Sequence, residues 1–230
     1  MSNEQAYPIG KQGEKWGDKE KSQWLNLQSI KRSYHLDVLT KIDGFTTDFD
    51  VINYGALSQD IEKYPLYLVK TKNWQPNKRT ILITGGVHGY ETSGVQGAIR
   101  FIESQALNYA EQFNLIIAPC ISPWGYETIN RWNPQTIDPN RSFYVNGPAE
   151  ESAALMHYFN ENNVKVFAHI DLHETTDTDN TTFRPALSAR DAIEQKEWQI
   201  PDGFYLVGDT LKPVDEFQQA IIKAVEKVTH

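Results

Sequence analysis

The sequence is poor in cysteine and in long apolar runs. Cys120 is its one cysteine, so no intrachain disulfide can form, and the thiol content gives no reason to expect an oxidising compartment. No stretch approaches the roughly 18 apolar residues of a membrane-spanning helix. The polar segment Met1 to Lys19 also lacks the apolar core of a secretory signal. We therefore expect a cytoplasmic protein without a disulfide framework and without a membrane partner.

Positive charge is also scarce. The chain has 22 Lys and Arg against 30 Asp and Glu, a formal net charge of −8 at pH 7. Such a balance argues against a surface that neutralises nucleic-acid phosphates or anionic lipid, and it leaves small or peptidic partners. With 40% hydrophobic residues, 230 residues are enough to bury a sizeable core. We predict a single domain over residues 1–230, with 1–17 as a mobile lead-in; the sequence is silent on the oligomeric state.

Hydrophobic spacing predicts strands that alternate with helices. Helical spacing covers 18–42, 93–113, 149–160 and 214–228, and short β-rich runs cover 49–54, 64–71, 80–84, 114–120, 164–172 and 204–207. This alternation predicts an α/β fold, with a mixed, largely parallel sheet covered by helices on both faces. Two long irregular segments, 122–148 and 174–190, interrupt the pattern, and loops of this length in a compact domain are usually functional.

The first candidate site residues are His88 and Glu91, directly after the predicted strand 80–84 and the pair Gly85-Gly86. An imidazole and a carboxylate at positions i and i+3 share one face of a helix start, so both can reach one metal ion. An H-x-x-E pair also arises often by chance. By itself it indicates no more than a helix start with a favourable negative charge.

A third ligand comes from the predicted strand 164–172. His173 follows that strand directly, as His88 follows its own, and ligands collect at the carboxyl ends of strands in such sheets. Two histidines and one carboxylate are a usual set for a catalytic zinc that keeps one position open for water. Asp171 could orient an imidazole from the same strand face. His169 ranks second as a ligand, and we interpret it as a core histidine.

The irregular segment 122–148 adds Arg131 and the run Asp138-Pro-Asn-Arg141. Two arginines near a metal suit an anionic substrate and an anionic transition state, since a guanidinium binds a carboxylate through two parallel hydrogen bonds. An isolated arginine in an acidic protein more often forms an ordinary ion pair.

Four ordered motifs together resemble the zinc carboxypeptidase family of carboxypeptidase A. They are TGGVHGYE, SPWGYETINR, DPNRSF and DLHE, and the match around them runs from about Thr80 to Glu174. They also look like the related succinylglutamate desuccinylase and aspartoacylase group. The resemblance implies a sheet of about eight strands between helices. It also implies one Zn2+ per chain, bound by His88, Glu91 and His173. By the same resemblance Arg131 would stabilise the oxyanion, and Asn140 and Arg141 would bind a carboxylate of the substrate.

The sequence departs from the family pattern at the general base. The family places this glutamate on a late strand, which would fall beyond His230, while Glu216 and Glu226 lie in the predicted last helix. Ser122 in place of the family's asparagine is a milder departure. We favour a chain that is cut short at its C-terminal end over a protein that binds without efficient turnover.

Three functions remain open after these observations. The leading prediction is a metallocarboxypeptidase that removes C-terminal residues from peptides by metal-assisted amide hydrolysis. An N-acyl amino acid deacylase would share the same core. It would need a further cationic side chain to bind an acidic acyl group, and Arg184 is a candidate. A catalytically impaired homologue that only binds peptides is the third. A second metal on His173, Glu174, Asp177 and Asp179 is less favoured, because aspartates in Thr-rich loops usually form turns.

Overall fold

The computed structural model describes residues 7–196, 199–201 and 203–229. The chain divides into two compact units, Met1–Gln195 and Lys196–His230, where the sequence predicted a single domain, and each unit is described by itself. The first unit contains the sheet and every predicted site residue. None of the helices in the described part of the chain has both the length and the apolar content needed to cross a bilayer.

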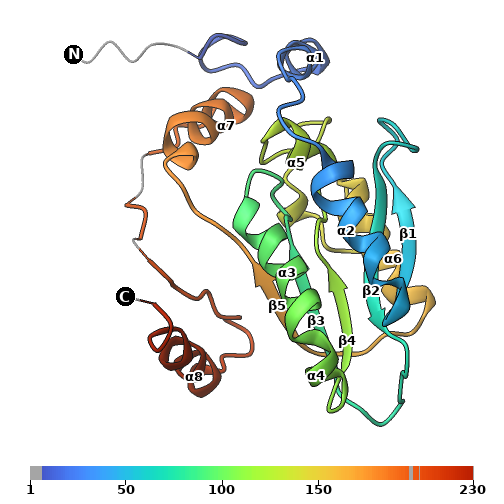
Figure 1. The fold of residues 1–230 in the computed structure, drawn as a ribbon. Helices are drawn as coiled ribbons and strands as arrows, with labels where there is room; N and C mark the ends of the chain where they lie inside the picture. The colour runs from blue at the N-terminus through green and yellow to red at the C-terminus, as the bar shows by residue number, and fades with distance from the viewer. Residues whose placement is uncertain (1–6, 197–198, 202, 230) are drawn as a thin grey trace. The chain divides into compact units, whose positions relative to one another are not determined.

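The centre of the first unit is one mixed sheet (Figure 1). Its strands are β1 Phe49–Ala56, β2 Pro65–Thr71, β3 Thr80–Gly85, β4 Asn114–Ala118 and β5 Val166–Leu172, in the order β1-β2-β4-β3-β5. The pairs β3/β4 and β3/β5 are parallel, and β1/β2 and β2/β4 are antiparallel. The described sheet therefore has five strands and equal numbers of parallel and antiparallel pairs, so the expectation of about eight mostly parallel strands was wrong.

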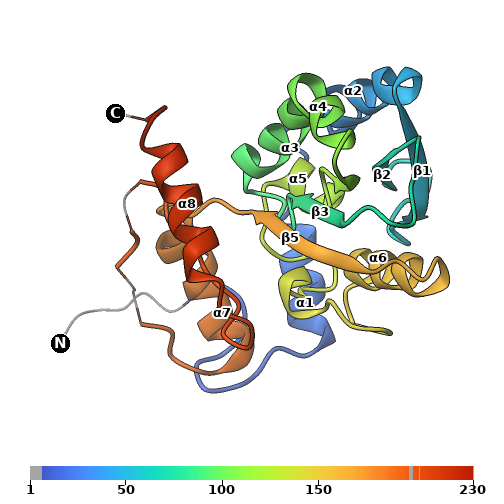
Figure 2. The same ribbon diagram turned by 90° about the horizontal axis from the view of Figure 1, so that it is seen from below.

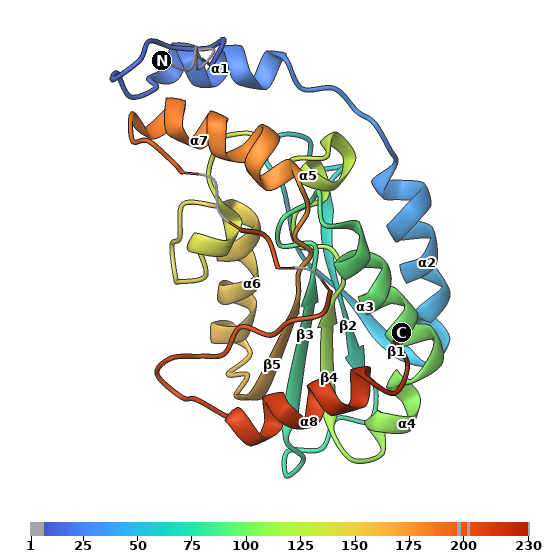
Figure 3. The same cartoon turned by 90° about the vertical axis from the view of Figure 1, so that its left-hand side faces the viewer.

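Helices cover both faces of the sheet, as predicted. Figure 3 shows α6 (Glu150–Glu161) on one side, with α2 (Thr40–Asp43) and α3 (Thr92–Ser104) on the other, and Figure 2 shows α4 (Ala106–Ala110) beside α3. Successive side chains of a strand point to opposite faces. In β4, Leu115 and Ile117 accordingly join the core under α3, whereas Ile116 joins the core under α6. Apolar residues on both faces explain why β4 is buried along its whole length.

The helix predicted over 18–42 is interrupted. Helix α1 spans Asp18–Asn26, and the next regular turn is π-helical, at His35–Leu39, just before α2. Glu127 explains the interruption, because its backbone oxygen accepts hydrogen bonds from the N–H groups of Lys31 (2.8 Å) and Arg32 (3.3 Å). Its carboxylate accepts a third from the N–H of Tyr34 at 2.9 Å. These backbone donors are satisfied by a tertiary partner in place of a helix.

The N-terminal segment packs against the rest of the first unit. Ile9 and Trp16, which the sequence placed in a mobile lead-in over 1–17, have buried side chains. The Trp16 ring lies edge-on to Trp132, with 6.3 Å between ring centroids, and its backbone N–H donates to the carbonyl of Arg190 at 2.9 Å. Aromatic burial of this kind is a major source of packing energy, so residues 7–17 are built into the fold. Residues 1–6 of the predicted lead-in lie outside the described residues.

Both segments predicted to be irregular contain short helices. The first contains α5 (Pro123–Thr128) and a 3-10 turn at Pro139–Arg141, and the second a π-helical turn at Asp179–Phe183 followed by α7 (Arg184–Asp191). Helix propensity does not predict these elements, because they are rich in glycine, proline, threonine and aspartate, which are poor helix formers.

The second unit contains α8 (Asp215–Val225), close to the predicted helix 214–228. Residues 204–207, which were expected to form a strand, have no regular secondary structure, and Val207 is 87% exposed. Four residues give a strand too little support unless a neighbouring strand completes the hydrogen-bond ladder.

Candidate metal centre

The turn between β3 and α3 carries His88 and Glu91. Both side chains are 2% exposed, and Glu91 is the residue that precedes the first turn of α3. The backbone N–H of Glu91 donates to the carbonyl of His88 at 3.1 Å, which closes a tight turn and points both side chains to one side. The i, i+3 arrangement expected from the sequence is therefore present.

Two glycines allow the close backbone approaches on which the site depends. A Cβ atom at Gly94 would lie 2.2 Å from the carbonyl oxygen of Leu172, the last residue of β5 before His173. A Cβ atom at Gly89 would lie 2.0 Å from the carbonyl carbon of Gly125 in α5. Real Cβ atoms do not approach so closely, so only glycine lets α3 sit on the end of β5 and α5 sit on the His88 turn.

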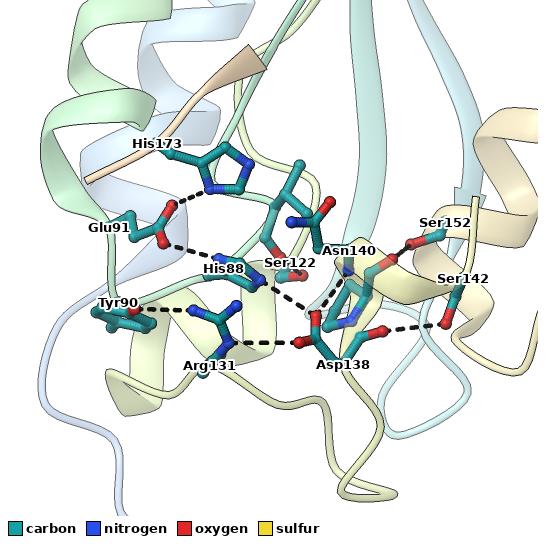
Figure 4. A network of polar contacts seen from close by, with 12 residues as sticks. His88, Tyr90, Glu91, Ser122, Arg131, Asp138, Asn140, Ser142, Ser152 and His173 are labelled. Atoms are coloured by element: carbon teal, nitrogen blue, oxygen red, sulfur yellow. Dashed lines mark hydrogen bonds and ion pairs between the residues drawn. The ribbon is translucent and has the colours of Figure 1, made fainter. Parts of the chain in front are cut away.

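These approaches bring His88, Glu91 and His173 together. The Glu91 carboxylate lies between the two imidazoles, with Oε1 2.7 Å from Nδ1 of His88 and Oε2 2.7 Å from Nδ1 of His173 (Figure 4). One donor atom from each residue lies within 4.8 Å of the others, a spacing that could hold one metal ion. This is the juxtaposition that the sequence predicted for the pair His88 and Glu91 and the distant His173.

The second ring nitrogen of each imidazole meets a carboxylate. His88 Nε2 lies 3.1 Å from Oδ1 of Asp138, and His173 Nε2 lies 2.7 Å from Oδ2 of Asp171. Such contacts fix the orientation of a metal-binding imidazole and point its Nδ1 toward Glu91, the third candidate ligand. Asp171 thus makes the contact with an imidazole that its expected orienting role requires. The sequence analysis did not predict the contact of Asp138 with His88. Asp138 begins the DPNR motif, two residues before the predicted substrate-binding residue Asn140, and this position could have pointed to it.

A buried hydroxyl extends the contact of Asp171. The Thr84 hydroxyl, at the end of β3, donates to Oδ1 of Asp171 at 2.6 Å and lies 2.7 Å from Nε2 of His169. Because that hydroxyl's proton is used on Asp171, its oxygen accepts from the imidazole. His169 is thus tied to the site through Thr84 and is not one of the three converging ligands. The interpretation of His169 as a core histidine was wrong, since it lies on the exposed side of β5.

Glu91 and His173 stabilise each other's charged forms. Burial works to raise the pKa of Glu91, but hydrogen bonds from His173 and His88 outweigh it and lower that pKa, so the carboxylate is ionised. Burial works to lower the pKa of His173, and the contacts with Asp171 and Glu91 reverse this and raise it to about 10. A protonated His173 imidazole therefore lies between the carboxylates of Asp171 and Glu91.

Arg131 lies beside the three converging residues and is held by three partners. Its Nε donates to Oδ2 of Asp138 at 3.3 Å, and its Nη1 donates to the Tyr90 hydroxyl at 3.2 Å (Figure 4). The same Nη1 lies 3.5 Å from Oδ1 of Asp179. Burial raises the pKa of Tyr90, so its phenol stays protonated and donates to Asp179 at 3.0 Å. Asp138 contacts both His88 and Arg131, and it thereby couples the guanidinium to the imidazole.

The two residues predicted to bind substrate occupy different surroundings. Arg141 is exposed, lines a cavity of about 630 Å³ together with Arg131 and Asp138, and its guanidinium makes no hydrogen bond or ion pair with the residues that the structure describes. Asn140 is half-buried, and its backbone N–H donates to Oδ1 of Asp138 at 2.9 Å. Arg141 is thus available to an anion from solvent.

The second cluster of candidate ligands does not form. Glu174 accepts hydrogen bonds from the N–H and hydroxyl of Ser93 at 3.0 Å each, which commits it to the first turn of α3. Asp179 is taken up by Tyr90 and Arg131. Within the described ranges, His88, Glu91 and His173 are the sole group of this kind with metal-ligand spacing.

The chemistry of this donor set fits zinc. Two imidazole nitrogens and one carboxylate are the ligand set of the catalytic zinc in thermolysin and carboxypeptidase A, which leaves a coordination position for water or substrate. Each imidazole also has a carboxylate partner at its other ring nitrogen, as supporting contacts to a metal-binding histidine usually provide.

The sequence comparisons point to one family. The family model of zinc carboxypeptidases matches residues 47–188, which include β1 to β5 and all the predicted site residues. No curated protein sequence matches the chain.

Solved structures from two Shewanella species resemble the fold. One from Shewanella denitrificans, provisionally assigned as a metallopeptidase, has a TM-score of 0.52 and 19% identity over 60% of this chain and 52% of that chain. One from Shewanella amazonensis with the same assignment has a TM-score of 0.52 and 20% identity over 64% and 61%. A third, from Shewanella denitrificans and provisionally assigned as a carboxypeptidase A, has a TM-score of 0.51 and 19% identity over 74% and 52%. At these identities the likeness establishes the fold, and the chain spans 52% and 61% of the length of the first two.

Proposed function

Because the chain belongs to the zinc carboxypeptidase family, we propose that it is a zinc-dependent hydrolase that removes C-terminal residues from peptides. The observation that carries this proposal is the convergence of His88, Glu91 and His173, with their donor atoms within 4.8 Å of one another. A zinc ion held there would polarise the scissile carbonyl and lower the pKa of a bound water to about 7.

The chain's own residues would orient the substrate and stabilise charge. Arg131 is fixed by Asp138, Tyr90 and Asp179, so its guanidinium needs little reorganisation to face an oxyanion that develops beside His88. Arg141 has no partner among the described residues, and we propose that it binds the terminal carboxylate of the peptide together with Asn140.

The proton acceptor is not assigned. Glu174, which directly follows His173, is held at the start of α3 by two hydrogen bonds from Ser93 to its Oε2. A homologue that binds peptides without turnover therefore remains the second candidate, and the deacylase is the third. Binding and hydrolysis must consequently be measured separately.

The metal site is tested by elemental analysis of the purified chain. We expect one equivalent of zinc, and we expect His88→Ala and His173→Ala to lose it, because two remaining ligands bind zinc weakly. His157→Ala, which removes an exposed histidine on α6, is the control and should keep the metal. Stoichiometric zinc in purified His88→Ala would refute the proposed ligand set.

The substrate class is tested with peptides that differ only at the C-terminus. We expect the zinc-loaded protein to bind a peptide with a free carboxylate and to bind its amide at least about tenfold more weakly, since a charge-assisted contact is lost. Release of the last residue from the free peptide would identify the peptidase. Preference for an N-acyl amino acid over every peptide would support the deacylase, and binding of free peptides without any release would support the binding homologue.

A further inference from the structure

The cavity beside the metal centre has a strongly cationic lining. It has a volume of about 630 Å³, and all its lining residues belong to the first unit. They come from the N-terminal segment, from the loop that contains Arg131 and Arg141, and from α7. Six of them are cationic, namely Lys15, Lys21, Arg131, Arg141, Arg184 and Arg190.

The acidic residues of the lining do not neutralise this charge. They are Asp138 and Asp191, and both are already engaged. Asp138 contacts His88 and Arg131. Asp191 holds Arg190 through two hydrogen bonds, of 2.8 and 2.9 Å. The cavity therefore carries an excess of positive charge, in a chain whose formal net charge is −8.

Several of these cations are free to bind an anion. Within the part of the chain that the structure describes, the side chains of Lys15 and Lys21 have no hydrogen bond or ion pair, and Arg141 has none either. Unpaired cations that face one cavity repel each other, so the arrangement raises the energy of the empty protein slightly and favours a bound anion.

Aromatic packing holds the cationic wall in place. The Arg190 guanidinium lies 4.3 Å from the centre of the Trp132 ring, and Trp132 packs edge-on against Trp16. Trp16 follows Lys15 directly in the sequence, so burial of its ring fixes the backbone that carries this lysine. A cation on a fixed backbone loses less conformational freedom when it binds a ligand.

The cavity lies next to the metal ligands, because Asp138 both lines the cavity and contacts His88. Asp138 and Arg131 both line it, and Oδ1 of Asp138 lies 3.1 Å from His88 Nε2. A substrate whose scissile carbonyl lies at the metal would therefore extend its terminal residue into the cationic cavity. Arg141 suffices for the terminal carboxylate, and Lys15 and Lys21 can interact with a further negative charge.

We propose that this cavity selects peptides whose C-terminal residue is glutamate or aspartate, with Lys15 and Lys21 as specificity-determining residues for the acidic side chain. The inference rests on the proposed function for the position of the terminal carboxylate. It adds the substrate class, which neither the metal ligands nor the family match defines.

The test compares peptides that are identical except for the last residue, which is Glu, Gln, Leu or Lys, each with a free and an amidated C-terminus. Dissociation constants are measured with the zinc-loaded full chain by fluorescence anisotropy. We expect the Glu peptide to bind about five- to tenfold more tightly than the Gln peptide, and the difference to shrink as salt is added.

The variant that tests the assignment is the double substitution Lys15→Gln and Lys21→Gln. Both residues lie outside the metal centre, and neither belongs to the buried core, so the fold should survive. We expect the preference for Glu over Gln to disappear, while zinc content and discrimination against amides are retained. Lys19→Gln removes a lysine of the same segment that does not line the cavity, and it should leave the preference intact.

The outcomes separate the two proposals. Equal binding of Glu and Gln peptides, or tighter binding of Lys, with amides still rejected, would overturn the acidic selectivity and leave the peptidase proposal standing. A full preference for Glu in the double variant would overturn the assignment to Lys15 and Lys21. Equal binding of free and amidated peptides would contradict the proposed function itself.

Discussion

Each imidazole at the metal centre uses one nitrogen toward Glu91 and the other toward an aspartate. For His173 the aspartate is Asp171, and its second oxygen is held in turn by the Thr84 hydroxyl at 2.6 Å. Thr84 is completely buried, and its hydroxyl also meets His169. His173, Asp171, Thr84 and His169 thus form one hydrogen-bonded series that joins the adjacent strands β3 and β5. The orientation of His173, which follows β5, depends on this series.

This series predicts that a conservative change outside the ligand set weakens zinc binding. Asp171→Asn and Thr84→Val should each lower zinc affinity by about 10- to 100-fold, the usual cost of losing a ligand's supporting partner. Affinity is measured by competition with a chromophoric chelator. Thr71→Val, which removes another buried strand hydroxyl, is the control for stability loss. Unchanged zinc affinity in Thr84→Val would show that the series does not orient His173.

At the scale of elements, the contact between α3 and the end of β5 brings the ligands together. Gly94 lies on the buried face of α3, and its α-carbon faces the carbonyl of Leu172. Gly97 lies on the same helix, but a Cβ atom there would meet only Cδ1 of Leu172 at 3.8 Å. The two glycines therefore offer a matched pair of substitutions, one that must move the helix and one that need not.

We predict opposite effects for alanine at these two positions. Gly94→Ala should destabilise the protein by about 1–3 kcal/mol through overpacking and should also weaken zinc binding, because Glu91 moves away from His173. Gly97→Ala should stabilise it by up to about 1 kcal/mol, since alanine is the better helix former. Chemical denaturation and zinc titration measure both effects. Normal zinc binding in Gly94→Ala would mean that the helix can shift without moving Glu91.

Helix α6 carries a buried carboxyl group whose ionisation opposes folding. Glu151 is completely buried, and burial raises its pKa to about 7 despite hydrogen bonds from Asn133 and Ser122. Because the folded pKa exceeds the unfolded value near 4.5, the folded state keeps a proton that the unfolded state has lost at intermediate pH. The contribution of Glu151 to stability is therefore neutral below about pH 4.5 and unfavourable above about pH 7.

Glu151→Gln should remove this pH dependence. Relative to the unsubstituted protein, the variant should gain stability as pH rises from about 4.5 to about 7, by on the order of 3 kcal/mol in total, and the gain should then stay constant. Urea denaturation across this pH range measures the difference. Glu161→Gln, at an exposed position at the end of the same helix, is the control and should show no such gain. A gain that is the same at pH 4 and pH 8 would contradict the assignment.

At the scale of the whole molecule, zinc would connect segments that are 82 residues apart in the sequence, since Glu91 and His173 share it. Ligands that bind only the folded state stabilise it by mass action, by about 2.7 kcal/mol at a concentration 100 times the dissociation constant. We predict that zinc raises the melting temperature, that EDTA reverses the rise, and that His88→Ala shows neither effect. Differential scanning calorimetry measures this, and an equal shift in His88→Ala would place the stabilising zinc elsewhere.

Several elements were predictable because their signals are local. Alternating or continuous apolar runs gave β1 to β5 to within a few residues, and the spacing of Val95, Ala98, Ile99 and Ile102 gave α3. The short helices α5 and α7 were missed, since their proline, glycine and threonine residues oppose helix and only tertiary packing stabilises it. Likewise, the break after α1 depends on Glu127, a partner far along the chain.

The sequence by itself determined which residues could bind a metal and that they follow strands. Residue type fixes the donor atoms, and a position directly after a strand places a residue at the carboxyl edge of the sheet. Only the tertiary structure decided how the site is completed: that Asp138 orients His88, that Thr84 supports Asp171, and that a cationic cavity forms in an acidic protein. The physical reason is that these contacts join segments distant along the chain, and their distances depend on side-chain packing that no local pattern encodes.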